Sequence, residues 1–246
     1  MTAKKILISQ KTPLNVTPYT TLTEKFGVEI EFKPFFVIEP LSSREFRAQR
    51  VNILDHTAII FSSRLAIDAF FKLSEELRVK IPETMKYFCT TEAVAMYLQK
   101  HIVYRKRKIF FGNGTPESIV ELIGTKHKGE KFLITTSDSS NVENLTGLFD
   151  KQQLEYTTAV FLKSVSTDLK DTDLHSYDVI VLYNPSDLAS LYENFPEFEQ
   201  KDIKFISYGR SIVKSMADAG LTTSIQAPNP ECSSVAKAIE IFLKQD

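Results

Sequence analysis

The chain has 246 residues, 43% hydrophobic and 25% charged, so it can bury one large core or two ordinary ones and is not expected to be disordered. Its formal net charge is −1, without the basic excess of most proteins that bind nucleic acid or a membrane surface, so neither partner is expected. No apolar run is long enough to cross a bilayer, and the first ten residues turn polar after two lysines, unlike a signal peptide.

Strand patterns alternate with helix patterns along the sequence. Short apolar runs, many of them β-branched, predict strands at residues 4–9, 28–40, 56–61, 85–89, 108–112, 131–136, 154–166, 177–183, 203–208 and 221–228. Helical spacing of apolar residues predicts helices at 17–27, 41–54, 62–78, 91–102, 114–126, 141–153, 186–195, 210–220 and 233–244. This alternation is typical of parallel sheets that are covered by helices on both faces.

Several residues predict where these elements begin, end and face the core. Gly27 is expected to end the first helix, and Ser42 or Ser43 to cap the second. Pro34 and Pro40 favour an extended chain, so residues 28–40 lead into a connector between domains, and residues 154–166 form the return path. The helix at 62–78 has an apolar side, which we expect to be buried: Leu65, Ile67, Phe70, Phe71, Leu73 and Leu77.

One strand–turn–helix unit occurs twice. Residues 56–73 and 177–195 each have an apolar strand, a polar turn and a helix with aromatic residues. At about the same distance further on, residues 85–102 and 203–221 each have a strand, a small polar turn and a second helix. We expect the turns of the two copies to face each other across a working cleft.

The turns of this repeat are candidates for ligand binding, because ligands of open parallel sheets bind beyond the carboxyl ends of the strands. There, backbone N–H groups and short polar side chains at helix starts suit carboxylates or phosphates. The alternative is that these side chains are ordinary helix N-caps. The candidate substrate-binding residues are Ser62, Ser63, Thr90, Asn184, Ser186, Gly209, Arg210 and Ser211. No catalytic residue is assigned.

The same segments carry a resemblance to a known family. In order, residues 58–71, 87–98, 179–191 and 205–221 resemble the uroporphyrinogen-III synthase family. The second half of that family reads strand, Ser-Pro-x-Gly, helix, then strand, Gly-Pro-Thr-Thr-Ala, and a helix that ends in glycine. The resemblance covers nearly the whole chain and is strongest at residues 204–221.

The resemblance implies a fold and a reaction. The fold is α/β, with two Rossmann- or flavodoxin-like parallel-sheet domains, residues 1–35 with 166–246 and residues 36–165, joined by a two-stranded connector near 33–40 and 156–165. The family enzyme closes linear hydroxymethylbilane into uroporphyrinogen III with inversion of the last pyrrole ring, and it uses no cofactor. A monomeric, cytoplasmic lyase of tetrapyrrole (haem) biosynthesis is therefore expected.

The chain departs from the family pattern at several positions. Asn184 to Asp187 replace Ser-Pro-x-Gly, while in the second motif Gly209 and Ser211 fit but Ile212 replaces the second threonine. In the family, a tyrosine is the favoured candidate for assisting departure of the substrate hydroxyl. At the corresponding position this sequence has Leu162. Phe161 has no hydroxyl and is expected on the opposite face, and Tyr156 is roughly 20 Å away along the strand.

Two functions therefore stay open. One is an active synthase, in which Arg210 either meets a substrate carboxylate or is merely solvated. The other is an inactive relative that binds an anionic ligand in its interdomain cleft.

Cys89 and Cys232 are far apart and the four histidines are scattered, so no metal site is expected. Cys89 is predicted to be a buried, unreactive thiol. A receiver domain is not expected, because it would have an acidic pair after the first strand, which this sequence lacks. A periplasmic binding protein is not expected either, because it would carry an export signal, a pattern that the first ten residues do not have.

Overall fold

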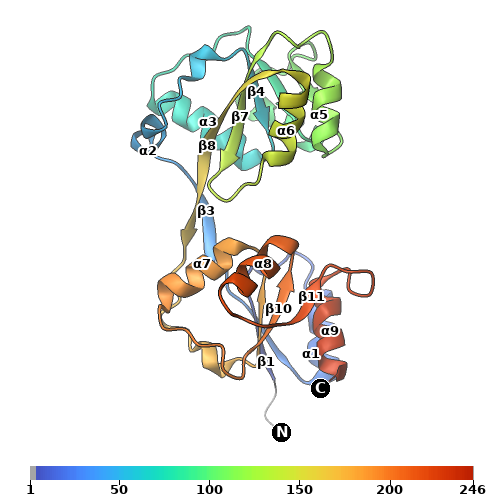
Figure 1. Cartoon of the computed structure of the whole chain (residues 1–246). Helices are drawn as coiled ribbons and strands as arrows, with labels where there is room; N and C mark the ends of the chain where they lie inside the picture. Colours follow the sequence, from blue (N-terminus) through green and yellow to red (C-terminus); the bar gives the residue numbers. More distant parts are fainter. Residues whose placement is uncertain (1–3, 246) are drawn as a thin grey trace. The chain divides into compact units, whose positions relative to one another are not determined.

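The structure is a computed structural model that describes residues 4–245 (Figure 1). Residues 1–3 and 246, at the ends of the predicted first domain, lie outside the described residues. The chain divides into unit 1, with residues up to Val37 and from Val165 onward, and unit 2, with Ile38–Ser164. No helix within the described residues is long and apolar enough to cross a membrane.

Unit 1 is built on a five-stranded sheet, counted over the described residues, in the order β2-β1-β9-β10-β11 with every neighbouring pair parallel. By position within the unit this is the order 2-1-3-4-5, which is that of flavodoxin-like sheets. Its strands are β1 (Lys5–Ile8), β2 (Glu29–Phe32), β9 (Val179–Leu182), β10 (Lys204–Tyr208) and β11 (Thr223–Ala227). Its helices are α1 (Thr17–Phe26), η3 (Leu174–Ser176), α7 (Pro185–Asn194), α8 (Arg210–Asp218) and α9 (Val235–Gln245).

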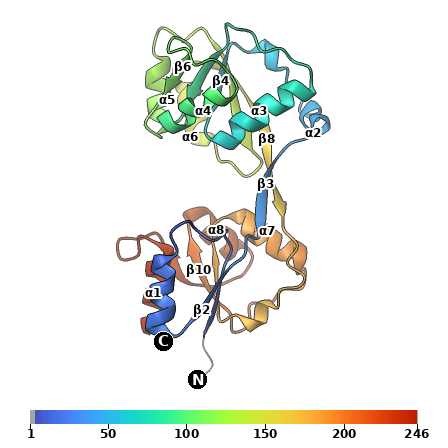
Figure 2. The ribbon, with the colours of Figure 1, turned by 180° about the vertical axis from the view of Figure 1, so that it is seen from behind.

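Both faces of the unit 1 sheet are buried, because side chains alternate along each strand. Ile6 and Ile8 pack with residues of α1 and α9 on one face, whereas Leu7 packs with residues of α7 and α8 on the other. Helices α1 and α9 lie side by side in both views (Figures 1 and 2). The continuous apolar runs in the sequence are therefore explained by strands that are covered twice.

Unit 2 is built on a six-stranded sheet, counted over residues 4–245, in the order β3-β8-β7-β4-β5-β6. Leaving out β3, the order by position is 5-4-1-2-3, which is that of Rossmann-like sheets. Its strands are β3 (Phe36–Pro40), β4 (Ala58–Phe61), β5 (Lys86–Cys89), β6 (Ile109–Phe111), β7 (Lys131–Ser137) and β8 (Glu155–Ser166). Its helices are α2 (Ser43–Ala48), η1 (Ile53–Asp55), α3 (Arg64–Glu76), α4 (Glu92–Tyr97), η2 (Leu98–Lys100), α5 (Pro116–Ile123) and α6 (Glu143–Gln152).

Strands β3 and β8 carry both crossings of the chain between the units. They are neighbours in the sheet, and the N–H of Leu41 donates to the carbonyl of Phe161 while the N–H of Thr167 donates to the carbonyl of Phe35. Because the partner numbers fall as the residue numbers rise, the two strands run antiparallel. The predicted two-stranded connector corresponds to this pair.

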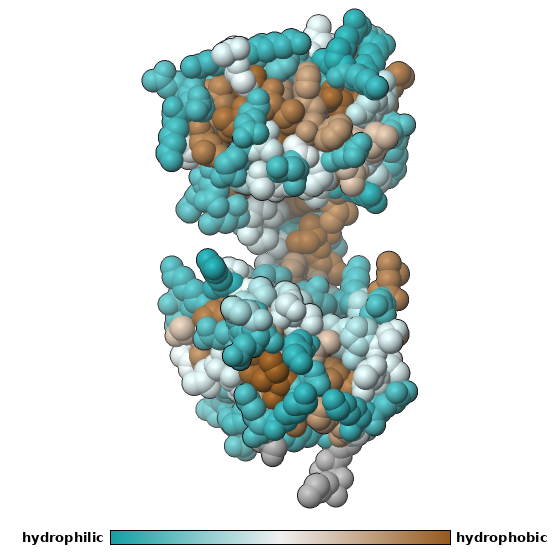
Figure 3. All heavy atoms as spheres, turned by 90° about the vertical axis from the view of Figure 1, so that its right-hand side faces the viewer, coloured by the Kyte–Doolittle hydropathy of each residue, from teal (hydrophilic) through white to brown (hydrophobic). Residues whose placement is uncertain are grey.

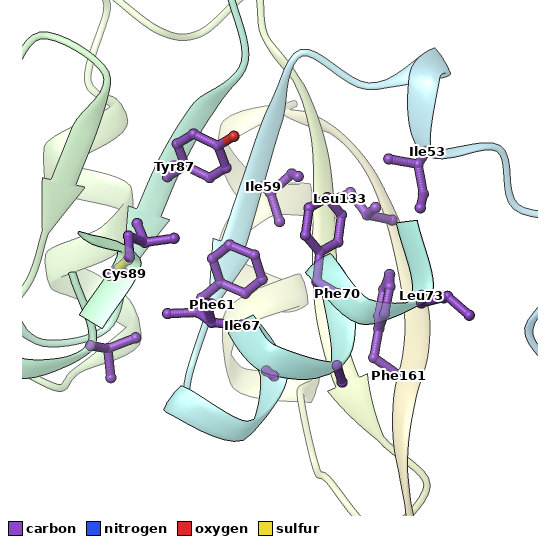
Figure 4. Close-up of a cluster of buried hydrophobic side chains, with 14 of the residues drawn as sticks. Ile53, Ile59, Phe61, Ile67, Phe70, Leu73, Tyr87, Cys89, Leu133 and Phe161 are labelled. Carbon is purple, nitrogen blue, oxygen red and sulfur yellow. The ribbon is translucent and has the colours of Figure 1, made fainter. Parts of the chain in front are cut away.

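The core of unit 2 is rich in aromatic side chains on the face covered by α3 (Figure 4). Phe70 of α3 is fully buried, with its ring centroid 5.4 Å from that of Phe61 and 5.7 Å from that of Phe161. Figure 4 shows these rings between the helix and the strands, together with Ile59 and Leu133. The predicted apolar side of α3 is confirmed at Phe70.

Two predictions about these elements are wrong. Leu65 is 52% exposed, because the buried side of α3 begins at Ala66 and Ile67, one position further along the helix. The helix predicted at 41–54 ends at Ala48, and Arg50 then has a φ of 56°, which is left-handed and cannot continue the helix. The short helix η1 follows. The predicted cap is confirmed at Ser42, which forms a capping box with Glu45.

Some large apolar side chains remain at the surface. Leu14 and Val103 are largely exposed, in unit 1 and unit 2 respectively. On the face drawn in Figure 3, apolar patches lie within a mainly polar surface on each unit. Exposed apolar atoms of this kind are normal for a folded protein and by themselves indicate no function.

Candidate functional site

The order of the strands points to one position in each sheet. In open parallel sheets, ligands bind beyond the carboxyl ends of the two neighbouring strands whose connections leave toward opposite faces. In unit 1 these strands are β1 and β9, and in unit 2 they are β4 and β7. The turns after these strands and their neighbours, together with the first turns of the helices that follow, contain all eight candidate binding residues.

The turn after β9 is held together by a buried carboxylate. Asn184 is the N-cap of α7, and its Oδ1 accepts from the N–H of Ser186 at 2.9 Å. Asp187 is fully buried, and its Oδ2 accepts from the N–H groups of Tyr183 at 2.8 Å and Asn184 at 3.0 Å. Asn184 and Asp187 therefore form a capping box, so the cap alternative is correct for the side-chain oxygen of Asn184.

Asp187 lies where the family pattern has a glycine, and its surroundings change its acidity. Burial raises the pKa of its carboxyl to about 6, although the backbone N–H groups of Tyr183 and Asn184 and the side chain of Ser9 act in the opposite direction. Ser9, from the turn after β1, is 1% exposed. The Oγ of Ser9 and the Oδ1 of Asp187 are both buried at this crossover without a hydrogen-bond partner among the described residues.

The turn after β10 depends on Gly209. Its φ is 136°, and a Cβ at this position would lie 3.1 Å from the carbonyl oxygen of Tyr183, so a larger residue would strain the turn. Arg210 and Ser211 follow in the first turn of α8, and both are exposed. Ile212, in place of the family threonine, is fully buried in the core. The loss of that hydroxyl therefore has a packing explanation.

In unit 2, the turns after β4 and β5 come together. The Thr90 hydroxyl donates to the carbonyl of Ser62 at 3.3 Å, and the N–H of Thr90 donates to the carbonyl of Phe61 at 3.0 Å. Ser63 is the N-cap of α3, since its Oγ accepts from the N–H of Ala66 at 3.1 Å. Ser62 is exposed beside it. Ser62, Ser63 and Thr90 therefore form one polar edge of unit 2.

Cys89 precedes this edge but takes no part in it. The side chain is fully buried among the apolar residues of unit 2, and burial raises the pKa of its thiol to about 12. A thiol with this pKa is almost entirely protonated at neutral pH and is a poor nucleophile. The prediction of a buried, unreactive thiol is confirmed.

Hydroxyl groups after β7 add to the same edge and were not predicted. Ser137 Oγ lies 2.6 Å from Ser140 Oγ, and Asp138 Oδ1 accepts from the Ser164 N–H at 3.0 Å and from its hydroxyl at 3.2 Å. The run Ser-Asp-Ser-Ser at 137–140, directly after an apolar strand, was the available signal. Because β7 adjoins β4 at the crossover, these residues belong to the candidate site of unit 2.

Leu162, at the position of the family tyrosine, is a core residue. It is 7% exposed and belongs to the same apolar cluster as Phe161, which is 1% exposed. The two were predicted on opposite faces of a regular strand, but the pairing of β8 with β7 shifts register, from Thr136 with Val160 to Ser137 with Leu162. This irregularity lets both side chains join one cluster. Tyr156 donates its hydroxyl to Asp150 at 3.0 Å.

Replacing Gly209 by alanine is expected to destabilise unit 1 by about 1–3 kcal/mol, because the new Cβ would combine a strained φ with a close contact to the Tyr183 carbonyl. Urea unfolding measures the change. The matched control is Gly147→Ala in α6, where a Cβ would meet nothing within 4 Å, and it should stabilise the helix by up to about 1 kcal/mol. Equal effects at both glycines would contradict this account.

Replacing Asp187 by asparagine is expected to change the pH dependence of stability. The pKa of Asp187 in the folded protein, about 6, lies above the ordinary value of 3.8. The contribution of this carboxyl to the free energy of unfolding is therefore fully present below about pH 4 and is lost as the pH rises through 6. Between about pH 4 and 8, the free energy of unfolding of the wild type should fall by roughly 3 kcal/mol relative to that of Asp187→Asn. Urea unfolding of both proteins across this range tests it. A constant difference would contradict the raised pKa.

Comparison with known proteins agrees with this geometry. Two solved structures are similar over 99% of this chain. One is uroporphyrinogen-III synthetase from Helicobacter pylori, with 15% identity, a TM-score of 0.57 and 100% of that chain covered. The other is a mutant uroporphyrinogen III synthase from the extremely thermophilic bacterium Thermus thermophilus, with 12% identity, a TM-score of 0.51 and 98% of that chain covered. At these identities the likeness shows the fold.

The sequence comparisons decide the family. No curated protein sequence matches the chain. The model of the family described as uroporphyrinogen-III synthase HemD, however, matches residues 17–237, which is most of the chain. The matched range includes all eight candidate residues. Of the four crossover strands it includes β4, β7 and β9 but not β1. The chain therefore belongs to the uroporphyrinogen-III synthase family.

Proposed function

We propose that this chain is a uroporphyrinogen-III synthase, which cyclises linear hydroxymethylbilane with inversion of the last pyrrole ring. The observation that carries the proposal is the family match over residues 17–237. The polar turns at the carboxyl ends of the strands in each unit support it, because they suit a substrate with many carboxylates. No observation favours the alternative of an inactive binding protein.

We further propose that the candidate residues bind the substrate carboxylates. In unit 1, the N–H groups in the first turn of α8 lie beside the exposed side chains of Arg210 and Ser211. In unit 2, Ser62 and Thr90 offer hydroxyl groups next to the first turn of α3. Each set combines polar donors with the positive end of a helix dipole. Bound carboxylates would fix a flexible substrate in the conformation that favours one ring closure.

The setting of the reaction follows from the same proposal. A tetrapyrrole substrate and a place in tetrapyrrole biosynthesis follow from the family. We propose a monomer that acts in the cytoplasm. We also propose that it has no nucleic acid or membrane partner, which the formal net charge of −1 favours. Sedimentation of the purified protein tests the oligomeric state.

The activity is tested with freshly prepared hydroxymethylbilane and separation of the uroporphyrinogen isomers. We expect the inverted isomer, uroporphyrinogen III, to dominate in the presence of the wild-type chain. A reaction without protein gives the background of spontaneous closure. If only the non-inverted isomer forms, the chain is not a synthase and the binding alternative stands.

Arg210 is expected to act on substrate binding. Replacing it by glutamine removes one charge-assisted contact with a carboxylate, so KM should rise roughly tenfold while kcat changes little. The matched control is Lys214→Gln, which removes an exposed cation one turn further along α8 and should leave KM unchanged. Initial rates of uroporphyrinogen III formation measure both. A wild-type KM in Arg210→Gln would show that Arg210 is merely solvated.

A further inference from the structure

A groove of about 220 Å³ opens at the amino ends of strands β5 and β6 in unit 2. Met85 and Lys108, each of which immediately precedes one of these strands, lie in its wall. The strands are parallel, so the groove is at the opposite edge of the sheet from Thr90, which follows β5 in the candidate site. Its apolar residues belong to the segments before the two strands: Ile81, Pro82, Met85, Ile102 and Val103.

The wall of the groove contains a buried tyrosine. Tyr87 of β5 is 4% exposed, and its ring centroid lies 6.3 Å from that of Phe61 and 6.4 Å from that of Phe71. Figure 4 shows its hydroxyl on the side of the ring away from Cys89, the last residue of β5. The hydroxyl has no hydrogen-bond partner among residues 4–245, yet its oxygen is not one of the unpartnered polar atoms that the protein encloses. Since Tyr87 lines the groove, the hydroxyl opens into it.

This hydroxyl is a hydrogen-bond donor at neutral pH. Burial raises the pKa of Tyr87 to about 12, so the group keeps its proton. A nearly buried donor without a partner is unfavourable, and it gains a bond when an acceptor enters the groove. An anionic oxygen forms a stronger bond of this kind than a neutral one.

The rim of the groove carries an excess of positive charge. Arg105 and Lys108 line it together with one acid, Glu83, whose carboxylate lies 3.4 Å from the Arg105 guanidinium. Lys108 forms no ion pair within the part of the chain that the structure describes. Residues 105–108 are four cations in a row. Charges of one sign beside low-dielectric walls attract the opposite charge, so the rim favours an anion.

The walls favour an apolar body attached to that anion. Val103 is 77% exposed and Ile81 and Ile102 are partly exposed, so a ligand that covers them removes apolar surface from water. The groove is smaller than the roughly 300–1,000 Å³ of sites for drug-sized ligands, so its ligand is smaller too.

We propose that this groove binds a small amphipathic anion, a carboxylate on a short apolar chain or ring. The carboxylate accepts from the Tyr87 hydroxyl and pairs with Lys108, and the apolar part lies against Ile102 and Val103. The proposal is carried by three features that meet in one groove: a buried hydroxyl and a cation, both without partners among the described residues, and apolar walls. The site goes beyond the proposed function, because it lies at the other edge of the sheet and its occupation requires no turnover.

The test follows the binding of octanoate to the full chain by ¹H–¹⁵N NMR titration at neutral pH. We expect saturable shifts that are confined to residues 81–87 and 102–108. Octan-1-ol lacks the anion and acetate lacks the apolar chain, so each should bind about tenfold or more weakly than octanoate. Octan-1-ol binding as tightly as octanoate, or octanoate shifts spread over both units, would overturn the proposal.

Two variants test the polar contacts. Tyr87→Phe removes only a hydroxyl and Lys108→Gln removes only a charge, and each should weaken octanoate binding about fivefold or more. The matched controls are Tyr156→Phe, whose hydroxyl donates to Asp150 in the wild type, and Lys128→Gln, at an exposed cation elsewhere in unit 2; both should keep wild-type affinity. Wild-type affinity in Tyr87→Phe and Lys108→Gln would overturn the proposal. Thermal unfolding should show that all four variants are folded.

A lipid surface offers anionic and apolar groups together, so it is tested separately. Vesicles that contain phosphatidylserine should not bind the chain, and binding to them but not to octanoate would overturn the assignment to a free acid. The outcome is also distinct from that of the proposed function. Octanoate bound in the groove of a chain that forms no uroporphyrinogen III would support this site while overturning the synthase activity.

Discussion

Parallel pairing of strands that are buried on both faces is the constraint on which the rest of this structure depends. It brings the carboxyl ends of neighbouring strands to one edge of each sheet, and there the first turns of the following helices present N–H groups. In unit 1 the strand ends carry Ser9, Tyr183 and Tyr208. In unit 2 they lead into Ser62 and Thr90. Polar groups that are distant in sequence therefore become neighbours because of the way the backbone is paired.

Some of those polar groups hold the turns, whereas others remain exposed. The side-chain oxygens of Ser63 and Asn184 accept from their own helices, and Asp187 accepts from two backbone N–H groups while it is fully buried. Arg210 and Ser211 are exposed and form no such cap. The cap interpretation of these turns is thus correct for Ser63 and Asn184, whereas ligand binding by Arg210 and Ser211 stays a prediction.

Local patterns predicted most elements, because burial on two faces and capping leave signals in a few neighbouring residues. The strand–helix alternation, the stop at Gly27 and the cap at Ser42 are examples. The failures have non-local causes. Leu65 follows the helical spacing but is 52% exposed, because the side of α3 that packs against the core begins at Ala66. Phe161 and Leu162 share one cluster because pairing with β7 disturbs the alternation of β8.

The sequence by itself determined the alternation of strands and helices, the chemistry of the turns and the family resemblance, because each depends on residues close together in the chain. Only the tertiary structure decided which strands adjoin, with a flavodoxin-like order in unit 1 and a Rossmann-like order in unit 2. It also decided that Asp187 is buried and that the ring of Tyr183 packs against that of Tyr208, 25 positions away by residue number. Burial and long-range contacts arise from packing, which no short stretch of sequence encodes.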